Sequence, residues 1–315
     1  LKKLLQNLNM KKFSITFISL NKSILRKDLK HKIEFIGLNC RRAIFSIFKL
    51  RSIVKNYKNS QNFSKIIVFS NQNFANIVSF ISLFKIKNIK KIFIDRNHLD
   101  ELDYSVDFSQ RIKNIVIKIF IKLFYQHADL VIGISKKLSA DLSKFCSSKV
   151  KTIYSPAYDL SIFKKASKKI KIENKFDYVI NVSRFTKRKD HYTTLCGFKL
   201  ATQKIKKLRL ILIGYGPEYK NIKNLIKKLK IEKKVIIFNK KDNVYPYIKK
   251  SNLLILTSKY EGMGNVLVEA IALNTPVISS NCNSGPSEIL LNGKGGDLFK
   301  VSDHRELSIK IINYF

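Results

Sequence analysis

Two glutamates that flank a glycine-bearing segment have a type and spacing suited to a chemical role. Glu261 and Glu269 stand eight positions apart in the stretch SKYEGMGNVLVEA, residues 258–270. A carboxylate accepts hydrogen bonds from hydroxyl groups, and a hydrogen bond to a charged group contributes about 1.5–3 kcal/mol. The pair is therefore suited to the vicinal hydroxyls of a ribose and to those of a second sugar. Acidic residues also favour helix N-termini because of the helix dipole, but this explains one glutamate more easily than two.

The segment between the glutamates is suited to an anion. Gly262 and Gly264 let the backbone approach a ligand closely, and the apolar segment 266–273 that follows is expected to be helical. The free N–H groups of a first helical turn, together with the positive end of the helix dipole, form a natural site for a diphosphate. The segment therefore predicts a diphosphate site beside the two carboxylates.

A basic loop supplies the complementary charge. Arg184 and Lys189 stand five positions apart in NVSRFTKRKD, residues 181–190, after an expected strand. Ligands of open α/β sheets bind at the carboxyl ends of the strands, and both side chains donate hydrogen bonds to phosphate oxygens. Taken alone, a solvated loop of a basic protein explains these residues better. Together with the glycine segment, they predict a phosphate-binding pair.

A second glycine turn has a simpler interpretation. Gly214 and Gly216 lie in RLILIGYGPE, residues 209–218, between an expected strand and an expected helix. The third glycine of a dinucleotide-binding fingerprint is absent, so we interpret this stretch as a tight turn.

Short β-branched runs that alternate with amphipathic stretches must position these loops. The expected strands are 13–20, 65–70, 91–95, 130–134, 178–182, 208–213, 235–238, 253–256 and 276–279. Continuous apolar strands separated by helices indicate parallel sheets that are covered on both faces. We therefore expect an α/β protein with two doubly wound, Rossmann-like domains, 1–164 and 165–315.

The composition leaves several classes of partner open. The chain has 61 Lys and Arg against 22 Asp and Glu, a net charge of +39. Nucleic acid, an anionic membrane surface or a phosphate-bearing substrate could each explain this charge. The Lys-, Asn- and Ile-rich composition expected from an AT-rich genome could explain it without any function. The four cysteines are far apart, which argues against a zinc site or a disulfide framework and indicates a reducing cytosol.

One expected helix has an unusual surface. Residues 111–126, RIKNIVIKIFIKLFYQ, place their polar side chains on a narrow stripe and leave most of the circumference apolar. Such a helix is either buried between layers or lies in a membrane interface, and we favour burial. No apolar run is long enough for a transmembrane helix, and the first residues lack the pattern of a signal peptide.

The motifs taken together resemble glycosyltransferase family 4, retaining transferases of the GT-B fold. The resemblance rests on SRFTKRK, IGYGPE, SKYEGMGNVLVEAIALNTPVISS and SGPSEILLNGKGG in the second half, and on ADLVIGISKKLSADL and TIYSPAYD in the first. It is weak before Asp95. It implies two Rossmann-like domains that face each other across a cleft. The first, 1–164, would be the acceptor-side domain with its start missing, and the second, 165–315, the nucleotide-sugar-binding domain with its end truncated.

The resemblance also implies how a nucleotide sugar is bound. Arg184 and Lys189 would hold the diphosphate, and Gly264 and Asn265 would offer it further hydrogen-bond donors. Glu269 would accept hydrogen bonds from the ribose hydroxyls.

Two catalytic-site residues follow from the same resemblance. Glu261 would bind the hydroxyls of the transferred sugar. His98, in IDRNHLD, resembles the histidine of the family that lies near the donor sugar, although a histidine at a strand end is more often structural.

The activity implied is retaining hexosyl transfer from a nucleotide sugar to a lipid-linked or envelope polysaccharide, such as lipopolysaccharide or capsule, in a bacterium. The SGPSEIL variant favours UDP over GDP. The sequence has no Asp-x-Asp, so we expect no metal, and no cofactor besides the nucleotide-sugar co-substrate. The expected partners are this donor, the glycan or lipid-linked acceptor and an anionic membrane surface on the cytoplasmic side, but no nucleic acid. The alternatives are a sugar-nucleotide epimerase of the same fold and a basic nucleic-acid-binding protein.

Overall fold

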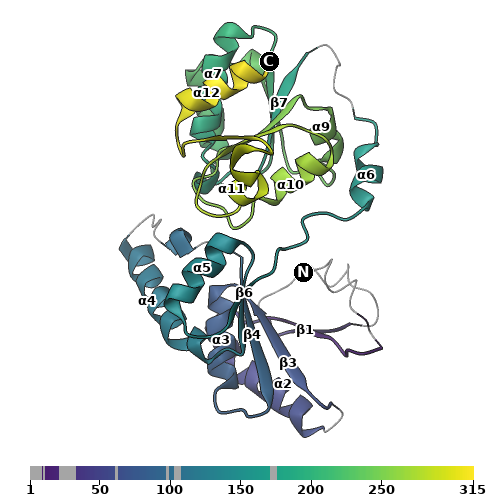
Figure 1. Ribbon diagram of the computed structural model, residues 1–315, viewed down its shortest axis with the longest axis vertical. Coiled ribbons are helices and arrows are strands. Elements are labelled where there is room, and N and C mark those ends of the chain that lie inside the picture. The colour runs from purple at the N-terminus through teal and green to yellow at the C-terminus, as the bar shows by residue number, and fades with distance from the viewer. Residues whose placement is uncertain are drawn as a thin grey trace. The chain divides into compact units, whose positions relative to one another are not determined.

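The computed structural model describes residues 9, 11–20, 33–60, 63–96, 99–102, 108–170 and 176–315. The chain divides into an N-terminal unit, Leu1–Pro156, and a C-terminal unit, Ala157–Phe315 (Figure 1). The division lies ahead of the boundary expected at 165 because helix α6 (Ser161–Ala166) packs within the C-terminal unit. Ile162 of this helix belongs to the same apolar cluster as Ile248.

The C-terminal unit contains a six-stranded parallel sheet in the order β12-β11-β10-β7-β8-β9. Its strands are β7 (Tyr178–Val182), β8 (Arg209–Ile213), β9 (Val235–Phe238), β10 (Leu253–Leu256), β11 (Val277–Ser280) and β12 (Asp297–Phe299). The chain enters at β7 in the middle, adds β8 and β9 on one side, and then places β10, β11 and β12 on the other. This order defines a doubly wound sheet whose direction of growth reverses between β7 and β10.

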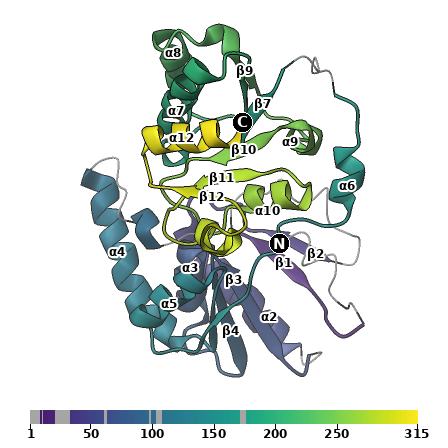
Figure 2. The same ribbon diagram turned by 45° about the horizontal axis from the view of Figure 1, so that its top comes forward.

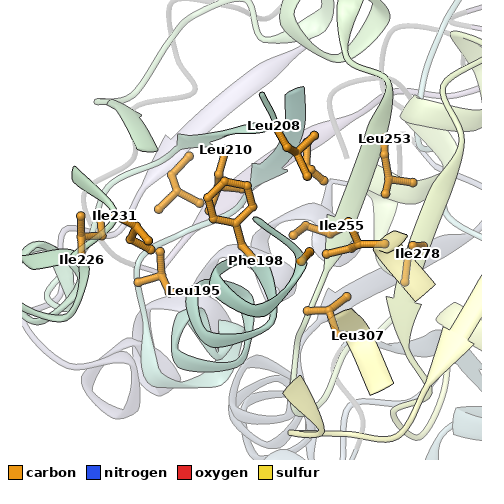
Figure 3. Packing of buried hydrophobic residues seen from close by; sticks show 14 of the residues in the cluster. Leu195, Phe198, Leu208, Leu210, Ile226, Ile231, Leu253, Ile255, Ile278 and Leu307 are labelled. Atoms are coloured by element: carbon orange, nitrogen blue, oxygen red, sulfur yellow. The ribbon is translucent and has the colours of Figure 1, made fainter. Parts of the chain in front are cut away.

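Helices cover both faces of this sheet. One apolar cluster packs the sheet against α7 (His191–Lys204), α8 (Tyr219–Lys228) and α12 (His304–Tyr314), as Figure 3 shows for part of it. A second cluster packs the opposite face against α6, α9 (Tyr245–Lys250) and α10 (Asn265–Ala272). Successive strand residues serve opposite clusters, as Leu210 and Ile211 do, because side chains alternate along a strand. The short helices of this unit are η5 (Lys187–Lys189), η6 (Glu232–Lys234), α11 (Pro286–Ile289) and η7 (Leu291–Gly293).

The N-terminal unit contains a four-stranded parallel sheet in the order β3-β4-β5-β6 and a separate parallel pair, β1-β2. The strands are β1 (Thr16–Ser19), β2 (Glu34–Gly37), β3 (Ile66–Asn71), β4 (Ile89–Asp95), β5 (Leu130–Gly133) and β6 (Val150–Thr152). The helices are η2 (Ala43–Ser46), α2 (Ile47–Asn59), α3 (Asn73–Leu83), η3 (Leu99–Leu102), α4 (Phe108–Phe124), η4 (Tyr125–His127) and α5 (Lys136–Phe145). Leu50 and Val54 of α2 pack with Val78 and Leu83 of α3 in the apolar core.

Helix α4 corresponds to the helix expected over 111–126, but the expectation that it is buried between layers is wrong. Only Asn114 and Ile121 of its described side chains are buried. Phe124 stacks on Phe80 of α3, with the ring centroids 4.6 Å apart. One line of contact cannot bury a helix that is apolar around most of its circumference, so much of this surface stays exposed. Within the described ranges, no helix combines the length and hydropathy needed to span a bilayer.

Candidate functional site

The predicted cationic and acidic loops follow β7 and β10, the two central strands of the C-terminal sheet. These strands are parallel neighbours, and the direction of sheet growth reverses between them. In open α/β sheets, ligands bind outside the carboxyl ends of the strands at this point. Arg184 and Lys189 follow β7, while Glu261 follows β10. The fold therefore brings both loops to the edge where a ligand is expected.

Lys189 and Glu261 are in direct contact. The Lys189 Nζ atom pairs with Glu261 Oε1, and only 12% and 8% of the two side chains are exposed. Ser258, at the start of the loop that follows β10, donates its hydroxyl hydrogen to the same oxygen at 2.6 Å. Removing one member of such a shielded ion pair leaves a buried charge without compensation, which typically costs about 3–5 kcal/mol.

Further hydrogen bonds tie the two loops together. Thr257 donates its hydroxyl to the carbonyl oxygen of Lys189 at 2.8 Å. The backbone N–H of Lys259 donates to the carbonyl oxygen of Arg188, also at 2.8 Å. The positions of Lys189 and Glu261 are therefore fixed by backbone contacts as well as by their own ion pair.

A chain of buried polar side chains supports the loop after β7. Asn181 donates through Nδ2 to the carbonyl oxygen of Ile255 in β10 at 3.1 Å. Ser183 donates its hydroxyl to Asn181 Oδ1 at 2.8 Å, and its oxygen lies 3.2 Å from His191 Nε2. Because the single hydroxyl hydrogen is used toward Asn181, His191 Nε2 must carry the hydrogen of the second bond.

The hydrogen-bond chain determines which ring nitrogen of His191 carries the proton, and burial determines its charge. With Nε2 protonated, the second ring nitrogen, Nδ1, is bare, and it has no hydrogen-bond partner among the described residues. Burial, with a further contribution from the charge of Lys189, lowers the pKa of His191 to about 4. The imidazole is therefore neutral at neutral pH. The residue was missed in the sequence; Asn181, a polar residue in an otherwise apolar strand, was the available signal for this chain of contacts.

Arg184 is placed differently from Lys189. Its side chain is exposed, and its guanidinium carbon lies 5.8 Å from the ring centroid of Tyr215. A stacked, exposed guanidinium keeps its donors available for a ligand. The structure thus brings Arg184 to the same edge as Lys189 but not into the ion pair.

The two glycines around Tyr215 have a structural cause. A Cβ atom at Gly214 would lie 1.9 Å from the carbonyl oxygen of Ser183, and one at Gly216 would lie 2.3 Å from that of Phe185. The turn after β8 therefore packs directly on the backbone of the loop after β7. This contact accounts for both glycines and agrees with their interpretation as a tight turn.

The start of α10 carries the other predicted donor-site residues. Gly264 caps this helix with φ 79°, a left-handed conformation that favours glycine, and Asn265 begins it in an exposed position. Glu269 is half-buried about one turn further on, where Tyr245 donates its hydroxyl to Glu269 Oε1 at 3.4 Å. Burial and the charge of Glu269 raise the pKa of Tyr245 to about 12. Tyr245 was not identified from the sequence.

The loop after β11 contacts the backbone of the glycine segment. Ser284 donates its hydroxyl to the carbonyl oxygen of Gly262 at 2.8 Å. Gly285 has φ 73°, and a Cβ atom there would lie 2.6 Å from the carbonyl oxygen of Met263. Nearby, burial and the charge of Glu261 raise the pKa of the Cys282 thiol to about 12, so this cysteine is not an activated nucleophile.

His98 lies outside the described residues, and its catalytic role stays a prediction.

Elsewhere in the N-terminal unit, Asp95 ends β4 and is fully buried. Its Oδ1 atom accepts hydrogen bonds from Asn76 and from the Tyr125 hydroxyl, each at 3.1 Å. Its Oδ2 atom has no partner among the described residues, and burial raises the pKa of Asp95 to about 7. In the parts of the chain that are described, no three His, Cys, Asp or Glu side chains gather to hold a metal ion.

Comparison with known proteins gives a consistent result. Residues 162–315 match the family model described as glycosyl transferases group 1. An uncharacterized glycosyltransferase of Methanocaldococcus jannaschii is 26% identical over 298 residues, which cover 89% of this chain and 72% of that protein. A Campylobacter jejuni enzyme, N-acetylgalactosamine-N,N'-diacetylbacillosaminyl-diphospho-undecaprenol 4-alpha-N-acetylgalactosaminyltransferase, is 31% identical over 199 residues, or 62% of this chain. The match covers 53% of that enzyme, about half its length.

The structural comparison addresses the fold. The crystal structure of Anabaena HepE in complex with UDP and glucose superimposes with a TM-score of 0.70 and 20% identity, covering 92% of this chain and 78% of HepE. The expected α/β architecture of two Rossmann-like domains is thereby confirmed, with the GT-B glycosyltransferases as structural relatives. The sequence matches agree with this at the level of the GT-B glycosyltransferase superfamily. Family 4 in particular stays a prediction.

Proposed function

We propose that this protein is a retaining, family 4 glycosyltransferase that moves a hexose-type sugar from a UDP-sugar to a lipid-linked or envelope polysaccharide acceptor. The observation that carries the proposal is the shielded contact between Lys189 and Glu261 at the reversal point of the C-terminal sheet. A cation and a carboxylate side by side suit a ligand in which a phosphate group adjoins a hydroxyl-bearing ring. A nucleotide sugar is such a ligand, and the family match covers this unit from residue 162 onward.

In this proposal, positive groups bind the diphosphate. Lys189 supplies a fixed charge, and the exposed Arg184 turns its guanidinium from Tyr215 toward the phosphate oxygens. Gly264 and Asn265 add donors at the positive end of the α10 dipole. The presence of UDP in the HepE crystal structure supports UDP as the nucleotide.

The two carboxylates bind hydroxyl groups. Both described contacts of Glu261, from Lys189 and Ser258, go to Oε1, and in the proposal this carboxylate accepts hydrogen bonds from the transferred sugar. Glu269, with Tyr245 beside it, accepts those of the ribose. The glucose in the HepE crystal structure supports a sugar subsite in a protein of this fold.

The proposed chemistry needs no enzyme nucleophile. The bond between the sugar carbon and the diphosphate oxygen breaks, and its electron pair leaves with the diphosphate. The acceptor oxygen forms the new bond on the same face of the sugar, and its proton passes to the departing diphosphate. Lys189, Arg184 and the N–H groups at the start of α10 stabilise the developing negative charge, and positioning supplies the rest. Transfer without a metal is part of this proposal, and His98 is expected near the donor sugar.

The acceptor and the location are inferred from relatives and charge. The name of the Campylobacter jejuni relative describes a diphospho-undecaprenol-linked sugar, which supports a lipid-linked acceptor taken by the N-terminal unit. The net charge of +39 supports peripheral binding to the anionic inner face of the cell membrane. The matches favour glycosyl transfer over the epimerase and nucleic-acid-binding alternatives.

The test is transfer from UDP- and GDP-sugars to native membranes, with and without EDTA. Glu269→Ala is expected to raise the KM for the donor at least about tenfold, because a charge-assisted hydrogen bond to the ribose is lost. The exposed Glu232→Ala serves as the matched control. Unchanged transfer by Glu269→Ala would remove the proposed donor site. Conversion of the sugar nucleotide without any acceptor would identify an epimerase instead.

A further inference from the structure

Helix α4 carries a row of exposed apolar side chains on the side opposite its core contacts. Six residues form the row, each between 40% and 76% exposed: Phe108, Ile112, Ile115, Val116, Ile119 and Leu123. Steps of three and four residues place them on one face of a helix, and the buried Asn114 and Ile121 lie on the opposite face. The row extends over about 22 Å, at 1.5 Å per residue.

Basic residues flank this apolar row. At 3.6 residues per turn, Arg111 and Lys122 fall on one side of the row and Lys113 on the other, and all three are exposed. Lys118 is half-buried, and every charged residue of the helix is basic. The nearest acidic residues in the sequence, from Asp100 to Asp107, precede the helix.

The apolar row and its basic flanks together indicate which kind of partner covers this face of α4. A row of six neighbouring apolar side chains is uncommon on a surface that only meets water. A second copy of the chain would cover the row but would bring two sets of positive flanks together. An anionic lipid leaflet offers both an apolar layer for the row and negative headgroups for the flanks.

We infer that α4 docks in the interface of an anionic lipid leaflet, with its axis parallel to the membrane surface. Its apolar row lies at the boundary of the acyl chains, and Arg111, Lys113 and Lys122 contact the headgroup phosphates. Figures 1 and 2 both show α4 along the outer edge of the N-terminal unit, where such a helix is accessible. The inference rests on the membrane part of the proposed function and names the surface responsible. Lipid binding is measured without any sugar nucleotide, so a failure here is distinguishable from a failure of transfer.

The experiment is co-sedimentation of the full chain with vesicles of phosphatidylcholine alone and of phosphatidylcholine mixed with phosphatidylglycerol. Wild-type protein is expected to bind the mixed vesicles at least about tenfold more tightly. Ile112→Gln/Ile119→Gln removes part of the row and is expected to weaken that binding about tenfold. Leu291→Gln/Ile309→Gln, at exposed positions of the C-terminal unit, is the matched control and should bind as wild type does.

A second pair of variants separates local from overall charge. Arg111→Gln/Lys122→Gln is expected to weaken binding to the mixed vesicles about tenfold. Lys227→Gln/Lys228→Gln, exposed on α8, removes the same charge and should have little effect. All substituted positions are exposed, so each variant is expected to fold. Circular dichroism verifies this.

Three outcomes overturn the inference. Equal lipid binding by the α4 variants and the wild type would show that this face does not contact the membrane. Equal loss of binding in the Lys227 and Lys228 control would show that overall charge is responsible. A wild-type dimer in light scattering that Ile112→Gln/Ile119→Gln makes monomeric, with lipid binding unchanged, would assign the face to a second copy.

Discussion

Both units of the protein bury a carboxylate at the carboxyl edge of a parallel sheet, Asp95 in the N-terminal unit and Glu261, besides Asp190, in the C-terminal unit. Glu261 and Asp95 are held by different kinds of partner. Glu261 in the C-terminal unit contacts the cation of Lys189 and the hydroxyl of Ser258. Asp95 in the N-terminal unit accepts its described hydrogen bonds from the neutral side chains of Asn76 and Tyr125. A neighbouring cation favours the charged form of a buried carboxylate, whereas burial among neutral groups favours the protonated form.

The comparison shows that position in a Rossmann-like sheet does not decide the role of a polar side chain. Both carboxylates occupy the edge where ligands bind in this architecture. The Lys189–Glu261 pair combines opposite charges next to the glycine segment that is proposed to bind a diphosphate. Asp95 instead holds β4, α3 and η4 together through neutral partners, and burial raises its pKa to about 7. The partners therefore distinguish the proposed ligand site from an internal support.

The largest effect is expected from breaking the charged pair. In the proposed reaction, Lys189→Ala is expected to lower kcat/KM about 100- to 1000-fold, because the diphosphate of the donor would lose its fixed cation in the transition state. Lys187→Ala, exposed in the same short helix, is the matched control and should change kcat/KM only slightly. Steady-state kinetics with a UDP-sugar gives the measurement.

The double variant Lys189→Ala/Glu261→Gln separates pairing from catalysis. It should regain thermal stability relative to Lys189→Ala, because no unpaired charge stays buried, but it should remain inactive. Recovery of activity together with stability would mean that Lys189 only supports the fold.

The next largest effect is expected at Asp95, the carboxyl group that is buried among neutral partners. The pKa of Asp95 is raised from its ordinary value of 3.8 to about 7 in the folded protein. Between pH about 4 and 7, unfolding of the protein therefore releases a proton from Asp95 that the folded state retains. The wild-type protein therefore loses stability as pH rises through this window, with the full loss above pH 7. Asp95→Asn removes this titration, so its stability relative to wild type should increase from pH 4 to pH 8.

One pKa unit corresponds to about 1.4 kcal/mol, so this change in relative stability should be on the order of a few kcal/mol. Thermal unfolding of both proteins at several pH values measures it, and the exposed Asp242→Asn is the matched control. A constant difference between Asp95→Asn and wild type at all pH values would mean that Asp95 is already ionised in the folded protein.

The smallest effect is expected at Glu269, the second glutamate of the proposed donor site. Tyr245→Phe removes a hydroxyl that donates to Glu269 over 3.4 Å, a long hydrogen bond. The KM for the donor should rise by about two- to fivefold, with kcat unchanged, since a net hydrogen bond contributes about 1 kcal/mol or less. A fall in kcat without a change in KM would place Tyr245 in the reaction step rather than in ribose binding.

Much of the fold could be predicted because the sheet strands are continuous apolar runs. β7, β9 and β10 begin and end at the residues expected from the sequence. β2, β6 and β12 were not predicted, since EFIG, VKT and DLF are short and lack such a run. The wrong expectation for α4 has another cause. The apolar surface of a helix, even where it covers most of the circumference, does not show how many other elements pack against that helix.

The candidate site could be predicted only in part, because residue type and spacing identify loops but not their contacts. Lys189 and Glu261 are 72 residues apart, and the pairing of β7 with β10 brings their loops together. Asn76, Asp95 and Tyr125 likewise come from three separate elements. No pattern within any one of these elements indicates the buried cluster that they form.

Helix α6 determines where the C-terminal unit could be joined to another protein without loss of its core. It precedes the first strand of the C-terminal unit, yet Ile162 packs with Ile248, and the carbonyl oxygen of Lys165 accepts a hydrogen bond from Asn243 at 2.8 Å. A chimera joined at 156 would transfer the unit with its apolar cluster intact. One joined at 165 would leave Ile162 on the wrong parent and expose the face that it covers. Recombination among proteins of this fold should therefore tolerate breakpoints before α6 and select against those inside it.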